Sequence, residues 1–376
     1  MLSDREEASV RRALEAVAAA LLRAESVDGP GVARGAAGMA LVHAALDPVR
    51  PGHGHGEAAR RWIEQAVAEV SQGEVGAGLF EGLAGIAWAI ERFKAESDDP
   101  NAVVDELLLE TVEGWADDGG LDLTYGLSGV AVFAAERMPS PVAERTLAEI
   151  VRRLEARAEP VAGGVAWLCD PEFNARQRAL NQLRGRYNLG VAHGQPGVLA
   201  ALALAGASGV EAARAERLLR AGLAWFLKQG DDGGAFPSAV SPGEPADSGL
   251  VHAWCYGSAG VGAFLQALGR RRGASDWAEA GARLLAAERA RSPQPQASLG
   301  LCHGVSSGVG LLGAEAAGPL SWAEVAPRLG DVSGEAGADG GLLMGLGGRA
   351  LVLARALGSR AVPWERLFLA DFLPGA

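Results

Sequence analysis

The chain has 376 residues, of which 49% are hydrophobic, so it can bury a large core, and we expect residues 1–376 to form a single domain. A net charge of -12 argues against nucleic acid and against an anionic membrane surface as partners. The N-terminus is polar and acidic, no apolar run is long enough to span a bilayer, and three cysteines are too few for a disulfide framework. These features predict a cytoplasmic protein with no membrane span.

Helical periodicity dominates the chain from its start. Ser3 and Glu6 form a capping box at the head of an amphipathic helix, Ser140 and Pro141 start another, and Ser321 with Glu324 predicts a third box. The apolar faces of the first two helices contain Val10, Leu14, Val17 and Leu21, and then Leu147, Ile150, Val151 and Leu154. We find no convincing run of alternating strands, so the predicted class is all-α.

A second kind of segment lies between the amphipathic helices and repeats seven times. Each copy is a Gly-x-x-Gly turn followed by a nearly all-apolar stretch. The first glycines of successive copies are separated by 47, 44, 68, 63, 47 and 41 residues. The copies begin at Gly35, Gly82, Gly126, Gly194, Gly257, Gly304 and Gly345, the copy at Gly304 being one residue longer. Apolar helices need burial on all sides, which predicts an α/α toroid with about seven inner and seven outer helices. An open α-solenoid is the alternative. A solenoid ends in a cap with a polar outer face, whereas the tail 364–372 is apolar and is expected to pack against the rest of the protein, which favours the closed ring.

Two of the three cysteines stand beside these glycines, in successive repeats. Cys255 lies two positions before Gly257, and Cys302 is followed directly by His303 and Gly304. Two thiolates and one imidazole suit a catalytic zinc, which takes three protein ligands and keeps a fourth position open. We therefore predict Zn²⁺ bound by Cys255, Cys302 and His303, whereas Cys169 is expected to be a core residue.

Other polar residues fall in the same loops. His193 occupies the position before Gly194 that His303 occupies before Gly304. It could be a fourth ligand, a general acid/base or a histidine satisfied by backbone carbonyls; we favour the acid/base role, because imidazole titrates near neutral pH. Asp122, in the loop before Gly126, is a candidate site residue or a helix cap. The only three tyrosines, Tyr125, Tyr187 and Tyr256, also lie in these loops.

The remaining polar features give weaker predictions. His43 is expected in the core, and His53 and His55 in a solvated connection. The long gap 158–188 contains four arginines that either grip a substrate or form a solvated face, and the gap 229–250 is rich in proline and glycine. The chain has no phosphate-binding glycine motif, so nucleotide binding is unsupported. The four arginines are Arg176, Arg178, Arg184 and Arg186.

The segments 254–257 (WCYG) and 302–304 (CHG) resemble the lanthionine synthetase C-like cyclases, and 188–194 (NLGVAHG) and the seven glycine repeats agree along almost the whole chain. The resemblance implies a zinc enzyme that forms thioether rings by adding peptide cysteine thiols to dehydroalanine or dehydrobutyrine. It implies that His193 protonates the enolate, that Asp122 deprotonates the thiol or orients nearby groups, and that Tyr256 lies near the zinc. The partners would be a dehydrated precursor peptide and a separate dehydratase, because no dehydratase-sized region precedes the toroid.

Two departures from the family pattern are visible. Val251 stands where many members carry an arginine, for which His252 or an arginine of the 176–186 loop could substitute, and the loop Gly304–Gly308 looks stretched. A relative that adds or binds glutathione is the nearest alternative function. An α/α-toroid glycosidase using Asp122 and Glu81, and a non-catalytic interaction module, are further alternatives.

Overall fold

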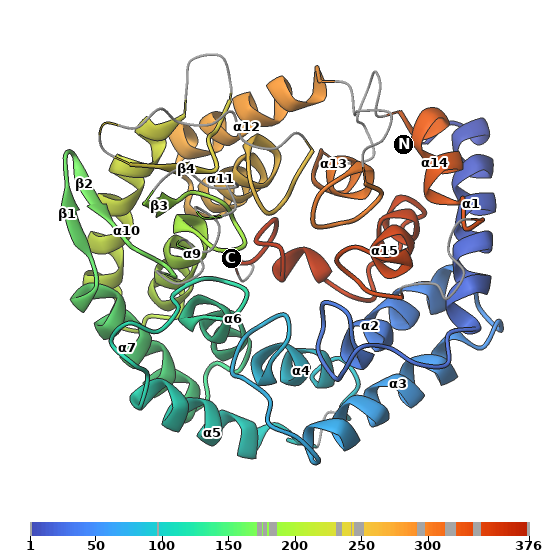
Figure 1. Ribbon diagram of the computed structural model, residues 1–376, viewed down its shortest axis with the longest axis horizontal. Coiled ribbons are helices and arrows are strands. Elements are labelled where there is room, and N and C mark those ends of the chain that lie inside the picture. Colours follow the sequence, from blue (N-terminus) through green and yellow to red (C-terminus); the bar gives the residue numbers. More distant parts are fainter. Residues whose placement is uncertain are drawn as a thin grey trace.

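The computed structural model describes residues 2–95, 98–170, 175, 179, 186–230, 235–241, 243, 252–291, 298–312, 321–333 and 340–373. Fourteen α-helices in these ranges form two concentric rings (Figure 1). The inner helices are α2 (Ala36–Leu46), α4 (Leu83–Ile90), α6 (Leu127–Glu136), α9 (Gln195–Ala207), α11 (Ser258–Arg272), α13 (Val305–Leu312) and α15 (Leu346–Ala356). The outer helices are α1 (Asp4–Leu22), α3 (His55–Val70), α5 (Ala102–Glu113), α7 (Pro141–Ala156), α10 (Ala212–Phe226), α12 (Ser275–Arg289) and α14 (Trp322–Leu329).

Apolar composition places each helix in its ring. In α9, every residue from Gln195 through Ala205 is buried, as expected of a helix covered on all sides. The outer helix α1 instead buries one face, including the four predicted positions from Val10 to Leu21, and its capping box forms as predicted. Ser321 precedes α14 but makes no side-chain capping hydrogen bond. No described helix is both long and apolar enough to cross a membrane.

The loops that precede the inner helices are joined edge to edge by backbone hydrogen bonds. In each loop, the residue two positions before the glycine offers its carbonyl to an N–H of a neighbouring loop. These carbonyls belong, in order, to Ala33, Phe80, Thr124, Ala192, Cys255, Cys302 and Leu343. The circle closes because the N–H of Leu343 donates to the carbonyl of Ala33 at 3.1 Å. The fold is therefore the predicted α/α toroid and not the open solenoid, and we call these seven segments the loop circle.

The C-terminal segment fills the middle of the toroid (Figure 1). It contains the 3-10 helix η4 (Trp364–Arg366) and ends the described chain at Leu373, with Trp364, Phe368 and Phe372 buried. The ring of Phe368 lies 4.7 Å from that of Trp254 and 5.7 Å from that of Phe80, measured between centroids. The docked tail predicted from its composition is thus observed, and it supports the residue next to Cys255.

Truncating Phe368 to alanine should destabilise the protein by about 3–5 kcal/mol, because a fully buried aromatic side chain leaves a cavity that its neighbours cannot fill. Urea unfolding measures this free energy. Val103→Ala on α5 is the control, since that side chain is 70% exposed and its loss should change stability by less than about 0.5 kcal/mol. Equal stability of the two variants would contradict the docked position of the tail.

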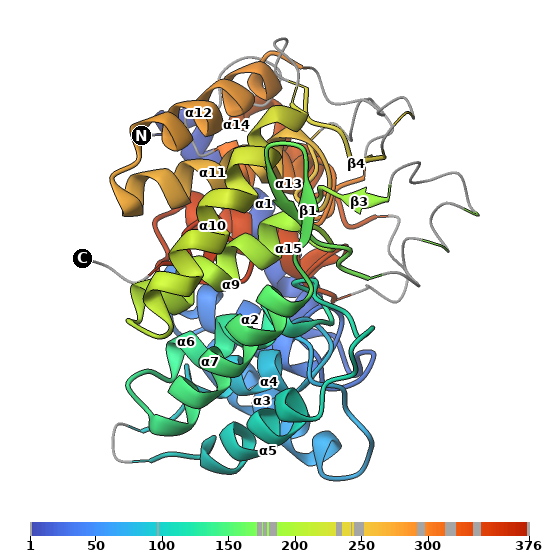
Figure 2. The same ribbon diagram turned by 90° about the vertical axis from the view of Figure 1, so that its left-hand side faces the viewer.

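Short strands occupy the two long gaps, for which no strand was predicted. β1 (Glu159–Val161) pairs antiparallel with β2 (Gly164–Ala166), and β3 (Tyr187–Asn188) with β4 (Ala239–Val240). Figure 2 shows β3 and β4 at one side of the toroid, on the right of that view. Strands of two or three residues are too short for alternation to reveal. Of the four arginines in 158–188, only Arg186 is among the described residues, and it pairs with Glu159 at 2.8 Å.

One histidine prediction was wrong. His55 is fully buried at the start of α3, and its Nδ1 lies 2.9 Å from Nδ1 of His43 on α2, whereas His53 is exposed as predicted. A hydrogen bond between two nitrogens needs one donor and one acceptor, so at least one of the two imidazoles is neutral. The glycines on either side of His55 favoured a loop prediction, whereas His55 lies at the start of the outer helix α3 and contacts the inner helix α2.

Burial holds the pKa of His43 at about 3 and that of His55 at about 4, below the ordinary 6.5. The unfolded chain therefore takes up protons that the folded chain refuses, and stability falls as pH drops below about 6.5. By pH 5 each imidazole should cost about 2 kcal/mol of unfolding free energy. Urea unfolding of His43→Gln should show a pH dependence shallower by that amount, while His53→Gln should match wild type. An equal slope in both variants would contradict a neutral buried pair.

Candidate metal centre

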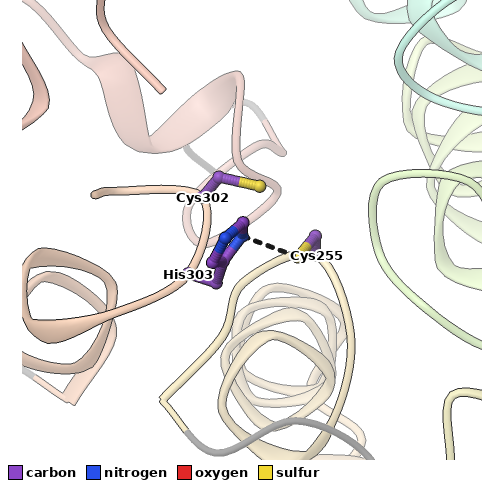
Figure 3. Close-up of side chains that lie close together, drawn as sticks. All are labelled: Cys255, Cys302 and His303. Carbon is purple, nitrogen blue, oxygen red and sulfur yellow. Dashed lines mark hydrogen bonds between the residues drawn. The ribbon is translucent and has the colours of Figure 1, made fainter. Parts of the chain in front are cut away.

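The loop circle brings the three predicted ligands together. Cys255 and Cys302 occupy the same position in adjacent loops, and the N–H of Cys255 donates to the carbonyl of Cys302 at 3.2 Å. Their thiol sulfurs and a ring nitrogen of His303 all lie within 4.8 Å of one another. Figure 3 shows the three side chains converging from the two loops. Among the residues the structure describes, this is the one group of three or more ligand-type side chains with such geometry.

Glycine conformation sets the two metal loops apart from the others. Gly257 has φ 99° and Gly304 has φ 123°, whereas Gly35, Gly82 and Gly126 have φ near the extended range. Positive φ favours glycine, and a Cβ on Gly304 would also collide with the carbonyl oxygen of Ser298. Gly257 thus permits the turn after Cys255 and Tyr256, and Gly304 the turn after Cys302 and His303.

Interactions among the three ligands shift the pKa of each of them. The Cys302 thiol and then His303 lower the pKa of Cys255 to about 5, although burial opposes this. The negative sulfur of Cys255 in turn raises the pKa of both Cys302 and His303. The cluster therefore favours the thiolate form of Cys255, which is the form in which cysteine binds zinc.

His193 lies in the neighbouring loop and contacts Asp122. The Nδ1 atom of His193 is 3.3 Å from Oδ1 of Asp122, which also accepts the N–H groups of Thr124 at 2.7 Å and Tyr125 at 2.9 Å. Because a carboxylate only accepts, Nδ1 of His193 is the donor in this contact. Asp122 is fully buried and does not cap α6, so the helix-cap alternative was wrong.

Tyr256 links this histidine to the metal ligands. Its ring centroid lies 6.4 Å from that of His193, and its hydroxyl accepts the side-chain N–H of Asn188 at 3.2 Å. Burial raises the pKa of Tyr256, so the phenol keeps its proton. Asn188 also accepts the N–H of Gly190 at 2.9 Å, which fixes the loop. No role was predicted for Asn188, although the Asn-x-Gly turn signal could have identified it.

The two departures from the family pattern resolve differently. Ser307, and not Gly308, takes the position of the second glycine in the Gly-x-x-Gly turn. Its N–H donates to the carbonyl of Gly300 seven residues back, just as the N–H of Gly38 donates to the carbonyl of Gly31. The loop is therefore not stretched; serine replaces one glycine. Val251 lies outside the described residues. His252 contacts Glu288 and the carbonyl of Arg291 with its side chain, so it does not take the place of an arginine in the centre.

Cys169 and the three tyrosines are further residues for which predictions were made from the sequence. Cys169 is fully buried, as predicted, and burial raises the pKa of its thiol. Tyr125 stacks on His193 with centroids 5.8 Å apart, whereas Tyr187 lies in β3 and its hydroxyl donates to Glu159 at 2.7 Å. The structure therefore places Tyr125 and Tyr256 beside His193 and gives Tyr187 another contact.

A toroid of two helical rings with a Cys-Cys-His cluster at its loop circle defines the class of protein. The family model of lanthionine synthetase C-like protein matches residues 26–313, and the chain belongs to that family. A solved structure of nisin cyclase is similar at a TM-score of 0.78 and 20% sequence identity, over 97% of this chain and 99% of that chain. Among the curated proteins no match is found.

Proposed function

We propose that this protein is a zinc-dependent cyclase that closes thioether rings in a dehydrated precursor peptide, with residues 1–376 acting as one unit. The observation that carries the proposal is the convergence of Cys255, Cys302 and His303 beside His193 in a chain of this family. A separate dehydratase would supply the dehydroalanine or dehydrobutyrine that the reaction consumes.

The residues present fit zinc. Two sulfurs and one imidazole nitrogen within 4.8 Å of one another form a set of three soft ligands, and three protein ligands are typical of catalytic zinc. The ion, when bound, would lower the pKa of a coordinated peptide thiol and so favour the thiolate at neutral pH. Cys255, Cys302 and His303 would hold it.

The side chains around the centre would handle the protons. In the reaction, the peptide sulfur bonds to the β-carbon of the dehydro residue, and the electron pair of the carbon–carbon double bond moves to form an enolate. Nε2 of His193 would deliver a proton to the α-carbon. Asp122 would hold Nδ1 or receive the thiol proton; where it only holds Nδ1, the thiol proton would pass to water. Either way one proton leaves the thiol and one reaches the α-carbon, and the Tyr256 hydroxyl would donate a hydrogen bond to the reacting groups. The scaffold would add proximity of the two reacting ends.

A relative that adds glutathione to dehydrated proteins would use the same centre. A synthetic peptide with one cysteine and one dehydroalanine tests both. Ring closure conserves mass, so alkylation of remaining thiols detects it, whereas addition of glutathione increases the mass. Loss of alkylation without added mass supports the cyclase; added glutathione alone supports the relative.

The glycosidase alternative has weaker support. It needs two carboxylates in the inner loops, but Glu81 pairs with Arg34 at 3.1 Å and Asp122 holds His193. Undiminished hydrolysis of a sugar substrate after complete chelation would favour it. Cys302→Ala retaining every function would favour the non-catalytic module.

A further inference from the structure

One side chain from each of the seven loops surrounds the loop circle. Because the carbonyls two positions before the glycines form the circle, the residues one position before the glycines lie around the same end of the toroid. We call these seven residues the rim. In the order of the circle they are Met344, Arg34, Glu81, Tyr125, His193, Tyr256 and His303.

The proposed chemistry uses only part of this rim. His193, Tyr256 and His303 belong to the candidate centre, and the other four residues form a contiguous stretch that we call the distal arc: Met344, Arg34, Glu81 and Tyr125. Tyr125 joins one end of the arc to the centre by stacking on His193. Met344 joins the other end, because its sulfur lies against Gly300 in the loop that carries Cys302 and His303.

An exposed apolar side chain stands at each end of the distal arc. Tyr125 is 54% exposed and Met344 38%, and they are two of the five large hydrophobic side chains that are exposed in the described part of the chain. The other three, Val67, Val103 and Leu107, lie on outer helices. Exposed apolar side chains beside a reactive centre are typical of a ligand-binding surface.

An ion pair holds the middle of the arc. The guanidinium of Arg34 contacts Oε1 of Glu81 and a carboxylate oxygen of Asp28, each at 3.1 Å. These two contacts use part of the donor fork of Arg34, which has five N–H groups. The remaining donors suit the backbone carbonyls of an extended peptide. The arc thus offers an apolar contact, a hydrogen-bond donor and a second apolar contact in sequence.

We propose that the distal arc binds the segment of substrate peptide that flanks the reacting residues. Apolar side chains of the peptide pack on Tyr125 and Met344, and Arg34 donates to its backbone. The arc is continuous with the candidate centre at both ends, so a bound segment presents its neighbouring residues to His193 and the metal ligands. The identity of the ligand as a dehydrated peptide rests on the proposed function.

Binding of an unreactive peptide tests the arc separately from catalysis. The probe is a short synthetic peptide with one dehydroalanine flanked by phenylalanine and leucine, and with alanine in place of cysteine. The Tyr125→Ala/Met344→Ala variant should raise its Kd, measured by calorimetry, about tenfold, because aromatic and apolar contacts of this size contribute about 1.4 kcal/mol. The matched control Val103→Ala/Leu107→Ala on α5 should bind as wild type does.

Zinc content and melting temperature of the arc variant should equal those of wild type, since both side chains are exposed. An arc variant that binds within a factor of about two of wild type overturns the proposal, as does a wild-type protein that does not bind the probe. If wild type binds the probe but closes no ring in the cysteine-containing peptide, the arc stands and the proposed cyclase function fails.

Discussion

Cys255→Ala should abolish ring closure and remove most of the bound metal. Contacts outside the ligand shell already change metal affinity by about 10–100-fold, so loss of one of three ligands should exceed that range. Thiol alkylation after incubation with the cysteine–dehydroalanine peptide measures the residual activity, and elemental analysis measures the metal. The expected activity is below about one hundredth of that of wild type.

The chain has its own matched control. Cys169→Ala makes the same chemical change at a buried cysteine whose thiol contacts the backbone of Trp167 and the side chain of Gln195, away from the three ligands. It should keep both metal and activity and lose only modest stability. A Cys255→Ala variant that closes rings as fast as Cys169→Ala would contradict the assigned centre.

His193→Gln should lower the rate of ring closure by about 10²–10⁴-fold while leaving the metal in place, because general acid–base groups contribute on that scale. Glutamine preserves hydrogen bonding but cannot deliver a proton at neutral pH. Elemental analysis and the rate of thiol loss separate the two effects.

Asp122→Asn is the companion variant for this histidine. It removes the carboxylate that fixes the proton on Nδ1 and should give an intermediate loss of rate with the metal retained. If His193→Gln instead lost its metal, His193 would be a ligand and not the proton donor, which is the alternative that its sequence position left open.

The fold was predictable because helical periodicity and glycine spacing are local patterns that the sequence itself displays. Seven apolar stretches, each behind a glycine turn, indicate the inner helices, and the amphipathic helices between them have one dry face each. The loop circle was not predictable, since its hydrogen bonds join backbone atoms and carry no side-chain signature. The same holds for His55, whose burial depends on a partner twelve residues away.

The sequence predicted site residues only where a chemically suitable side chain also stands at a repeated position relative to a glycine. Cys255 and Cys302 share one place relative to their glycines, and the circle makes that place a meeting point. Asp122 could be named but not assigned, because its contact with His193 spans 71 residues. The loop from Gly304 to Gly308 was wrongly predicted to be stretched, because a count of glycines cannot recognise that Ser307 takes a glycine's position.

X-ray absorption at the zinc edge of the purified wild-type chain tests the central claim most directly. The account predicts about one zinc per chain, coordinated by two sulfurs, one imidazole nitrogen and one lighter exchangeable ligand. Zinc with no sulfur neighbours, or a chain that binds no zinc when it is supplied, would contradict the account.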